Sequence, residues 1–156
     1  DLLQPDATLS IAEIGDRVGL SQTPCWKRIQ RLEADGVIER RVAILNPEKL
    51  DLPLIVFVSI ETSDHSEGWL SHFAAVVSEM PEVLELYRMA GEVDYMLRVV
   101  VSGMPAYDAF YKRLIARIDI SDVSTTFAME QIKHTTALPL SYVVLDKEQK
   151  EKAAAG

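Results

Sequence analysis

Apolar residues follow two different patterns on the two sides of Pro47 and Pro53. Ahead of these prolines the apolar positions recur at helical spacing, as at Ile11, Ile14 and Val18, while behind them short apolar runs alternate with helical stretches. Such a change of period favours a boundary between two domains. The pattern predicts domains at 1–45 and 54–140, a linker at 46–53 and a C-terminal tail at 141–156.

The N-terminal part of the chain predicts two helices with a tight turn between them. Ser10 and Glu13 have the S-x-x-E spacing of a capping box, so a helix should begin at Ser10, and Gly19 should end it. Ser21 is the N-cap of a longer helix that reaches about Asp35. The following segment, "GVIERRVAILNP", alternates apolar and charged residues as a short strand or wing does. Together these elements predict a winged helix-turn-helix.

The second predicted helix has a buried stripe and an opposite polar face. Cys25, Ile29 and Leu32 form the stripe, with Cys25 as a small core residue rather than a redox sensor. Glutamine and arginine bond base edges, while lysine, arginine and hydroxyl groups hold phosphates. The alternative is the solvated face of an ordinary amphipathic helix, with Trp26 as a packing residue. The residues expected at DNA are Ser21, Gln22, Thr23, Trp26, Lys27, Arg28, Gln30 and Arg31.

The C-terminal part predicts an α+β domain. Strands are expected at 54–61, 83–89, 95–101 and 123–132, and helices at 67–78 and 105–118. The order βαββαβ is that of the ferredoxin-like fold, an antiparallel sheet with both helices on one face. Because the strands are apolar at most positions, a partner subunit is expected to cover the other face.

Charge is distributed unevenly along the chain. The 156 residues have a net charge of -8, yet residues 1–50 hold seven Lys or Arg against eight Asp or Glu, and residues 51–156 hold nine against sixteen. Residues 21–32 include Lys27, Arg28 and Arg31 and no carboxylate, a local charge of +3. A small basic helix on an acidic body is compatible with DNA binding, because phosphate contacts are local.

The number of cysteines and the lengths of the apolar stretches indicate the cellular compartment. One cysteine cannot form an internal disulfide, which favours a reducing cytoplasm. The richest apolar stretch, 52–60, is about half of what a membrane-spanning helix needs. We therefore expect a cytoplasmic protein with no membrane partner.

A second group of interest lies between two predicted strands, at 90–94. Gly91 permits a positive φ and close backbone approach, and Asp94 could accept a hydrogen bond from an ammonium group. Thr125 and Thr126 of the last predicted strand could supply hydroxyls to the same region. The alternative is a hairpin with a charged loop.

Enzyme chemistry finds little support in the sequence. His65, His72 and His134 are far apart and lack metal-binding or triad spacing, and Gly91 and Gly103 are isolated rather than part of a phosphate-binding loop. We expect no catalytic residue, no metal and no cofactor.

These segments together strongly resemble the Lrp/AsnC (feast/famine) family of bacterial transcription regulators. The string L-S-x-x-x-C-x-x-R-x-x-x-L-E-x-x-G-x-I spans Leu20 to Ile38, and G-x-x-D-Y spans Gly91 to Tyr95. The resemblance covers residues 2 to about 140. Within the family, "TPCWKR", "RMAGEVDY" and "FAMEQIK" look closest to the DecR-like subgroup, which includes a cysteine-responsive regulator of sulfur-amino-acid breakdown.

The resemblance implies a function and an assembly. It implies an effector-binding and oligomerisation (RAM) domain that pairs sheets across a dimer, dimers that assemble into octamers or similar rings, and a small amino acid bound between dimers. It implies double-stranded DNA as a partner and a nucleoid-associated location in the bacterial cytoplasm. The effector is expected to be cysteine or another sulfur-containing or branched amino acid. The implied effector residues are Met89, Ala90, Gly91, Asp94, Thr125 and Thr126.

One departure and two rival functions accompany this resemblance. The first helix of the family begins roughly ten residues earlier, so Leu2 and Leu3 are expected to be the end of a truncated helix. The rivals are a stand-alone amino-acid sensor without a DNA role and a small dimeric enzyme of ferredoxin-like fold. The basic helix speaks against the first, and the lack of catalytic residues speaks against the second.

Overall fold

The computed structural model describes residues 1–143 and divides the chain into two compact units. Unit 1 contains residues 1–44 together with the segment that begins at Lys133, and unit 2 contains residues 45–132. Most of the tail expected at 141–156 lies outside the described residues. Unit 1 is thus built from two separate stretches of sequence.

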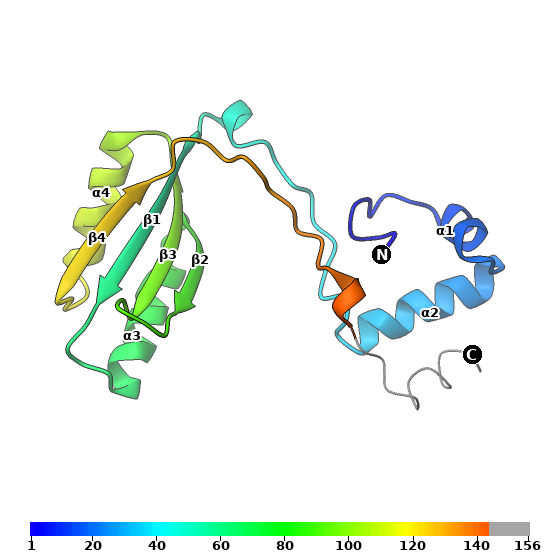
Figure 1. Ribbon diagram of the computed structural model, residues 1–156, viewed down its shortest axis with the longest axis horizontal. Coiled ribbons are helices and arrows are strands. Elements are labelled where there is room, and N and C mark those ends of the chain that lie inside the picture. Colours follow the sequence, from blue (N-terminus) through cyan, green and yellow to red (C-terminus); the bar gives the residue numbers. More distant parts are fainter. Residues whose placement is uncertain (144–156) are drawn as a thin grey trace. The chain divides into compact units, whose positions relative to one another are not determined.

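Unit 1 contains the helices α1 (Ile11–Val18) and α2 (Gln22–Ala34), which are labelled in Figure 1. The predicted capping box is confirmed: the Ser10 hydroxyl accepts the Glu13 amide proton at 3.2 Å, and a Glu13 carboxylate oxygen accepts from the Ser10 amide at 2.8 Å. Gly19 ends α1 in the left-handed conformation, at φ 70°. Residues 1–8 form turns rather than the end of a helix.

A small core holds the two helices together. Ile14, Cys25 and Ile29 are buried in it, which confirms Cys25 as a core residue. Leu32, predicted in the same stripe, is 40% exposed. Ile38 packs on the cluster instead. Its amide donates a hydrogen bond to the Leu32 carbonyl near the end of α2. The partly buried residues around this core are Leu2, Leu3, Leu9, Ile11, Leu20 and Ile38.

The predicted wing does not form a strand. Residues 37–47 contain no strand, no described strand pairs with them, and Val42 and Ile44 are more than half exposed. A strand needs a neighbour for its backbone hydrogen bonds, and the alternating pattern by itself supplies none. Arg41 ties this segment to α2 through an ion pair with Glu33 at 2.9 Å.

The two described ends of the chain meet in unit 1. The Gln4 side-chain amide donates to the Leu138 carbonyl at 3.1 Å, and the Gln4 side-chain oxygen accepts from the Leu138 amide at 2.7 Å. The C-terminal segment is therefore fixed to the turns that precede α1.

Unit 2 has the predicted ferredoxin-like order. Its antiparallel sheet has the strand order β2-β3-β1-β4, with α3 and α4 behind the strands in Figure 1. Strand β4 ends at Phe127 rather than at the predicted Ile132, because Phe127 pairs with Val56 and little of β1 remains beyond that position. The elements are β1 (Leu54–Glu61), α3 (Glu67–Ser78), β2 (Val83–Arg88), β3 (Tyr95–Val101), α4 (Met104–Ile115) and β4 (Asp122–Phe127).

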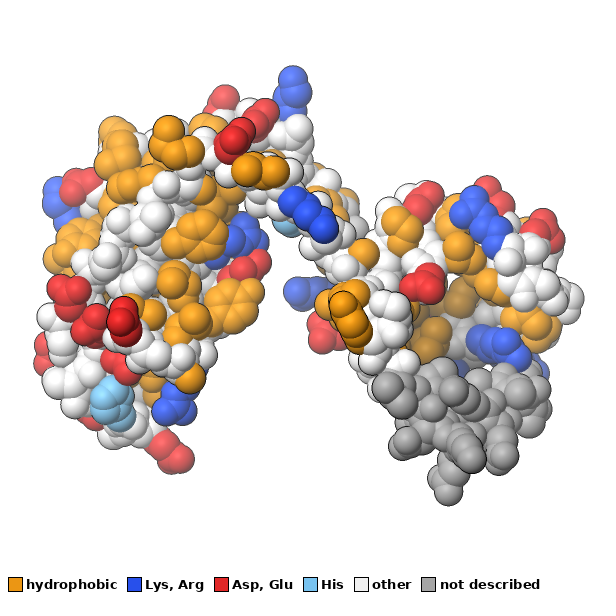
Figure 2. Space-filling view, viewed as in Figure 1, with side chains coloured by type: hydrophobic (Ala, Val, Ile, Leu, Met, Phe, Trp, Pro, Cys, Tyr) orange, Lys and Arg blue, Asp and Glu red, His pale blue; other side chains and the backbone are white. Residues whose placement is uncertain are grey.

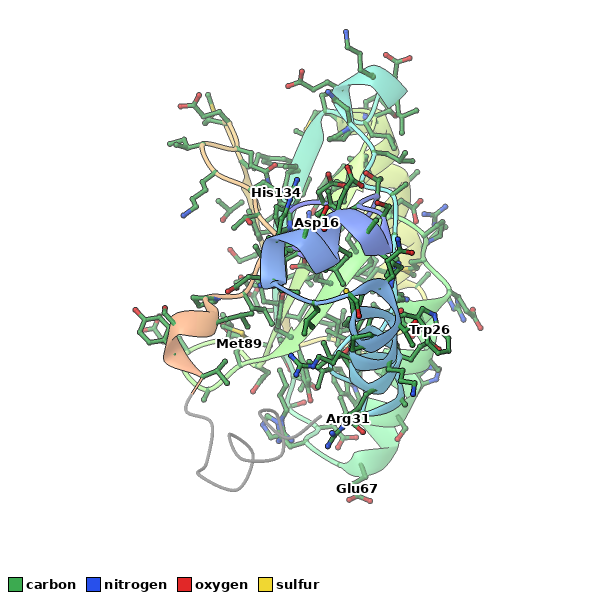
Figure 3. All side chains as sticks on the ribbon, turned by 90° about the vertical axis from the view of Figure 1, so that its right-hand side faces the viewer. Asp16, Trp26, Arg31, Glu67, Met89 and His134 are labelled. Atoms are coloured by element: carbon green, nitrogen blue, oxygen red, sulfur yellow. The ribbon has the colours of Figure 1, made fainter. Side chains whose placement is uncertain are left out.

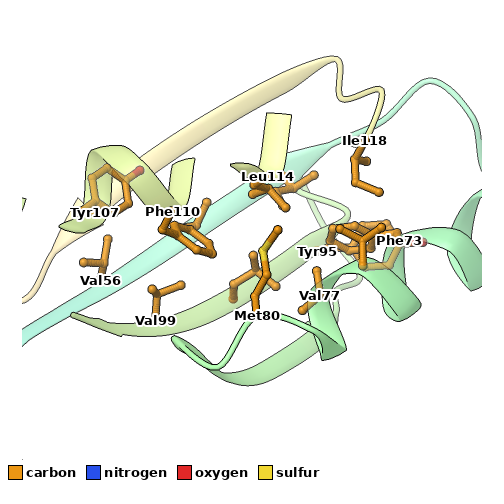
Figure 4. Close-up of a cluster of buried hydrophobic side chains, with 14 of the residues drawn as sticks. Val56, Phe73, Val77, Met80, Tyr95, Val99, Tyr107, Phe110, Leu114 and Ile118 are labelled. Carbon is orange, nitrogen blue, oxygen red and sulfur yellow. The ribbon is translucent and has the colours of Figure 1, made fainter. Parts of the chain in front are cut away.

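The core of unit 2 lies between the sheet and its two helices. Strands β1 and β3 direct alternate side chains to this side, and these pack with Phe73, Phe110 and Leu114 of the helices, as Figure 4 shows. The rings of Trp69, Phe73 and Tyr95 contact one another with centroids 4.9 to 5.5 Å apart; Trp69 stacks on Phe73, and Phe73 meets Tyr95 edge to face. Alpha helix α4 ends at Ile115, earlier than predicted, although Ile118 remains buried.

The other side of the sheet is not covered by the helices, and Figure 2 looks onto it. Hydrophobic side chains gather there among a few charged ones. We call this surface the open face; by strand alternation and register it consists of Ile55, Phe57, Ser59, Glu61, Glu85, Tyr87, Met96, Arg98, Val100, Asp122, Ser124 and Thr126.

Candidate DNA-binding helix and effector loop

All eight side chains that the sequence placed at DNA belong to exposed residues in the structure. They are Ser21, Gln22, Thr23, Trp26, Lys27, Arg28, Gln30 and Arg31. Ser21 precedes α2 as its N-cap residue, and Pro24 lies in the first turn. Trp26 is 50% exposed rather than packed, and Figure 3 shows Trp26 and Arg31 projecting outward from α2.

Two of these polar side chains are held by acidic neighbours on the same helix. Arg31 pairs with Asp35 at 3.5 Å, and the Gln30 amide donates to Glu33 at 2.8 Å. Both Arg31 and Asp35 are more than half exposed, so water competes for this ion pair and it contributes little to stability. Arg31 can therefore leave Asp35 for a base or phosphate at small cost.

The loop between β2 and β3 is fixed by Asp94. The Asp94 amide donates to the Ile60 carbonyl at 3.1 Å, its carbonyl accepts from the Met89 amide at 2.8 Å, and carboxylate Oδ2 accepts from the Thr62 amide at 2.8 Å. Asp94 thus joins the loop 89–94 to the loop 62–66 that follows β1. Met89, Ala90 and Gly91 are exposed in the first loop, and Gly91 has the predicted positive φ, at 157°.

One carboxylate oxygen of Asp94 remains available beside this junction. Asp94 Oδ1 lies 3.8 Å from Nδ1 of His65, and the Asp94 side chain is 33% exposed. Thr62, the buried residue whose amide bonds Oδ2, exchanges hydrogen bonds with the backbone of Asp64 through its hydroxyl. A carboxylate held in this way is pre-positioned to accept from an ammonium group.

Thr62 and His65 were not among the residues expected beside Asp94. Neither lies in a motif, and the only signal was the topology, which places the end of β1 beside the start of β3 because the two strands pair antiparallel.

The structure separates the two threonines that the sequence placed at one site. Thr125 lies on the helix side of the sheet, where its hydroxyl and that of Tyr107 are 2.5 Å apart. Thr126 is the register partner of Phe57 on the open face. Successive residues of a strand point to opposite faces, so the two hydroxyls do not converge.

Residues 1–143 contain neither a candidate metal site nor a candidate membrane-spanning helix. No group of three or more His, Cys, Asp or Glu residues there could hold a metal ion. His72 contacts the Arg117 carbonyl at 3.1 Å rather than another ligand-type side chain. No helix among these residues is long and apolar enough to cross a membrane.

Two protein-family models match the chain. The model described as the Lrp/AsnC ligand binding domain matches residues 55–138, and a winged helix-turn-helix DNA-binding model matches residues 1–39. The first match covers the sheet domain and extends into the C-terminal segment of unit 1, and the second covers α1 and α2.

Relatives similar over most of the chain are transcription regulators. The DNA-binding transcriptional activator DecR of Escherichia coli (strain K12) is 54% identical over 89% of this chain and 92% of its own length. The glutamate uptake regulatory protein of Zymomonas mobilis is 50% identical over 90% of this chain and 85% of its own. The leucine-responsive regulatory protein of Escherichia coli (strain K12) is 36% identical, covering 87% and 84%. These similarities support the predicted regulator and the prediction that the chain is not an enzyme.

Solved structures share the same architecture. An AsnC family transcriptional regulator from Agrobacterium tumefaciens superposes with a TM-score of 0.89 at 62% identity, over 92% of this chain and 94% of that chain. A transcriptional regulator from Neisseria meningitidis in complex with L-methionine gives a TM-score of 0.86 at 33% identity, over 92% and 93%.

Proposed function

The chain belongs to the Lrp/AsnC family and is a DNA-binding transcription regulator with an amino-acid ligand domain; from this premise we propose that α2 reads an operator sequence and that the loop 89–94 binds a sulfur-containing amino acid. The position of Asp94 is the observation that most supports separate sites for DNA and for the amino acid. Asp94 anchors a loop of unit 2 and retains one oxygen for a ligand, while the basic helix belongs to unit 1.

For operator binding, the side chains of α2 divide into two roles. Arg31 and Gln30 reach base edges, because both groups form bidentate hydrogen bonds with bases in the major groove. Lys27 and Thr23 hold phosphates, since a lysine ammonium and a hydroxyl group suit the backbone better than base edges. Ser21, Gln22, Trp26 and Arg28 complete the surface.

For effector binding, Asp94 Oδ1 accepts the α-ammonium group and the backbone at Gly91 receives the carboxylate. Met89, which is 43% exposed, contacts the side chain of the ligand, since a thioether adapts to varied apolar groups. Cysteine and methionine are the first choices and leucine the next. The L-methionine complex of the Neisseria meningitidis regulator and the leucine-responsive relative of Escherichia coli support methionine and leucine as candidates.

The proposed assembly is a homodimer formed through the open face. Further association of dimers into octamers places the effector loop, including Ala90, at contacts between dimers. Thr126 lies on the open face and contacts the partner subunit, while Thr125 lies on the side of α4. The two threonines therefore do not line one ligand site. The regulator works in the bacterial cytoplasm, in association with the nucleoid.

A thermal-shift screen of the twenty amino acids on the full chain tests the effector part. A ligand at 100 times its dissociation constant stabilises by about 2.7 kcal/mol, which raises the melting temperature measurably. Cysteine, methionine or leucine should give the largest increase. If none of the twenty changes the melting temperature, the proposed pocket is wrong.

Selection of bound fragments from a bacterial genomic library, followed by fluorescence anisotropy on one selected fragment, tests the DNA part. Affinity should fall steeply between about 50 and 200 mM salt, because phosphate contacts release counterions. It should also change when the effector found in the screen is added. An affinity that does not depend on salt would exclude the proposed role of α2.

A further inference from the structure

Glu33 of α2 bonds two side chains at once. Its Oε2 accepts from the Gln30 amide nitrogen at 2.8 Å, and its Oε1 accepts from the Arg41 guanidinium at 2.9 Å. The Glu33 side chain is 34% exposed and that of Arg41 is 41% exposed. We call these three side chains the Glu33 bridge; they belong to α2 and to the segment that follows it, and all lie within unit 1.

The Glu33 bridge fixes the direction of the Gln30 amide. An ionised carboxylate only accepts hydrogen bonds, so the amide nitrogen of Gln30 has to face Glu33 and the amide oxygen has to point elsewhere. Turning the amide over would bring its oxygen against the carboxylate. Gln30 is exposed, and among residues 1–143 no group donates to its amide oxygen. That oxygen is therefore the group that Gln30 presents to a partner.

Gln30 lies on the side of α2 that carries other residues proposed to contact DNA. Trp26 precedes it by four positions and Lys27 by three, which places these side chains on neighbouring turns of one helix face. Hydrogen bonds and repulsions are stronger where water is displaced from such a surface. The direction of the Gln30 amide, which water screens in the free protein, therefore becomes costly to reverse once α2 is bound to DNA.

The four bases differ in the major-groove group that would meet this oxygen. Adenine and cytosine carry an amino group, which donates to an amide oxygen, while guanine and thymine carry a carbonyl oxygen, which repels it. We propose that Glu33 is a positioning residue for DNA recognition, which acts through Gln30 to make one operator position favour adenine or cytosine over guanine or thymine. This inference rests on the proposed contact of Gln30 with base edges.

Arg41 has a different task in the Glu33 bridge. DNA phosphates repel a carboxylate, and the Arg41 guanidinium neutralises that of Glu33. Repulsion by the phosphate backbone is the same for every base sequence. Loss of Arg41 therefore weakens binding in general, while Glu33 still accepts from the Gln30 amide and still fixes its direction.

Fluorescence anisotropy on a genomic fragment selected by the wild-type chain, and on every single-base variant of that fragment, tests the role of Glu33. At one position the wild-type chain should prefer adenine or cytosine by about ten-fold, and Gln30→Ala should abolish this preference and thereby identify the position. Glu33→Gln keeps the size of the side chain but can donate as well as accept, so it holds the Gln30 amide in either direction. It should largely remove the preference, while affinity for the best sequence stays within a few-fold of wild type.

Two control variants separate the direction of the amide from charge. Arg41→Met loses the ion pair with Glu33 and should weaken binding to every variant of the fragment by a similar factor, with the preference unchanged. In the double variant Q30A/E33Q the second substitution should change the base preference no further than Q30A does, because Glu33 acts through Gln30. Melting curves check that each variant keeps the wild-type fold.

The outcomes distinguish this inference from the proposed contact of Gln30 with DNA. If Glu33→Gln keeps the full preference, if Arg41→Met loses it to the same extent, or if the preferred bases are guanine or thymine, Glu33 does not position Gln30 as proposed. If Gln30→Ala binds every variant of the fragment with the wild-type preference, Gln30 does not reach a base edge. That part of the proposed function is then wrong, and the role of Glu33 falls with it.

Discussion

At the scale of single residues, Asp94 has two separable tasks. Asp94→Asn keeps an oxygen for the Thr62 amide but loses the negative charge, so we expect near wild-type stability and no effector binding. Asp94→Ala also leaves the Thr62 amide unpaired and should lower the free energy of unfolding by about 1–3 kcal/mol. Melting temperatures with and without the effector measure both effects. Normal effector binding by Asp94→Asn would place the ligand elsewhere.

Arg31 offers a residue-scale test of DNA recognition. Arg31→Ala should weaken operator binding by about 1–3 kcal/mol and relax the preference at one base position. Asp35→Ala, which frees Arg31 from its ion pair, should leave binding equal or tighter, because it removes a competing carboxylate. Anisotropy titrations with the operator and single-base variants measure these changes.

Lys27→Ala is the matched control for Arg31. A phosphate contact carries no sequence information, so its loss should weaken binding about equally for every sequence and reduce the salt slope by about one. If Arg31→Ala behaved in the same way, Arg31 would be a phosphate contact too.

At the scale of elements, two helical glycines predict opposite outcomes. A Cβ at Gly15 of α1 would lie 2.6 Å from the Leu20 carbonyl oxygen. Gly15→Ala must therefore displace the turn between α1 and α2 and should lower the free energy of unfolding by roughly 1–3 kcal/mol. A Cβ at Gly68 of α3 would meet only the Ser66 hydroxyl at 3.9 Å. Gly68→Ala should therefore be neutral or stabilise by roughly 0.5–1 kcal/mol. Thermal unfolding of both variants measures this, and equal melting temperatures would refute the difference.

The capping box predicts how acid affects α1. The hydrogen bonds from Ser10 lower the pKa of Glu13 below its ordinary value of 4.5. A carboxylate with a lowered pKa stabilises the folded state above its unfolded pKa, and this contribution is lost as the pH falls through the folded value. Glu13→Gln should therefore reduce the loss of stability between about pH 5 and pH 3. Circular dichroism melts across that range would show it, and an unchanged pH profile would contradict it.

Elements whose ends are set locally could be predicted from sequence. β1, α3 and β3 lie at the predicted bounds, because their alternation or helical period agrees with the side chains that they bury. The end of β4 and the lack of a strand in the segment after α2 could not be predicted, since both depend on the neighbour with which a strand pairs. Leu32 fits the stripe of α2 but lies where no described neighbour fully covers it.

The site was predictable where it follows from one element alone. The exposed face of α2 follows from the helical period around Cys25 and Ile29. The contact between Asp94 and Thr62 joins residues 32 positions apart, so it needed the sheet topology. The opposite orientation of Thr125 and Thr126 follows from strand alternation, once both are assigned to one strand.

At the scale of the whole molecule, two cores predict two unfolding transitions. Among residues 1–143, the core of unit 1 contains three buried residues and that of unit 2 contains fifteen. Unit 1 should unfold first, because it buries much less apolar surface. Cys25, buried in unit 1, should react with a thiol reagent at a lower temperature than that at which the sheet signal is lost. Coincident transitions would indicate one cooperative unit.

The contact between Gln4 and Leu138 affects the order in which the two units can fold during synthesis. Unit 1 is assembled from the beginning of the chain and from a segment that follows the whole of unit 2. A ribosome that has synthesised residues 1–44 has therefore not yet supplied all of the DNA-binding unit. The contacts between Gln4 and Leu138 can form only after the ligand-binding domain has left the ribosome. The ligand-binding domain is therefore complete before the DNA-binding unit is.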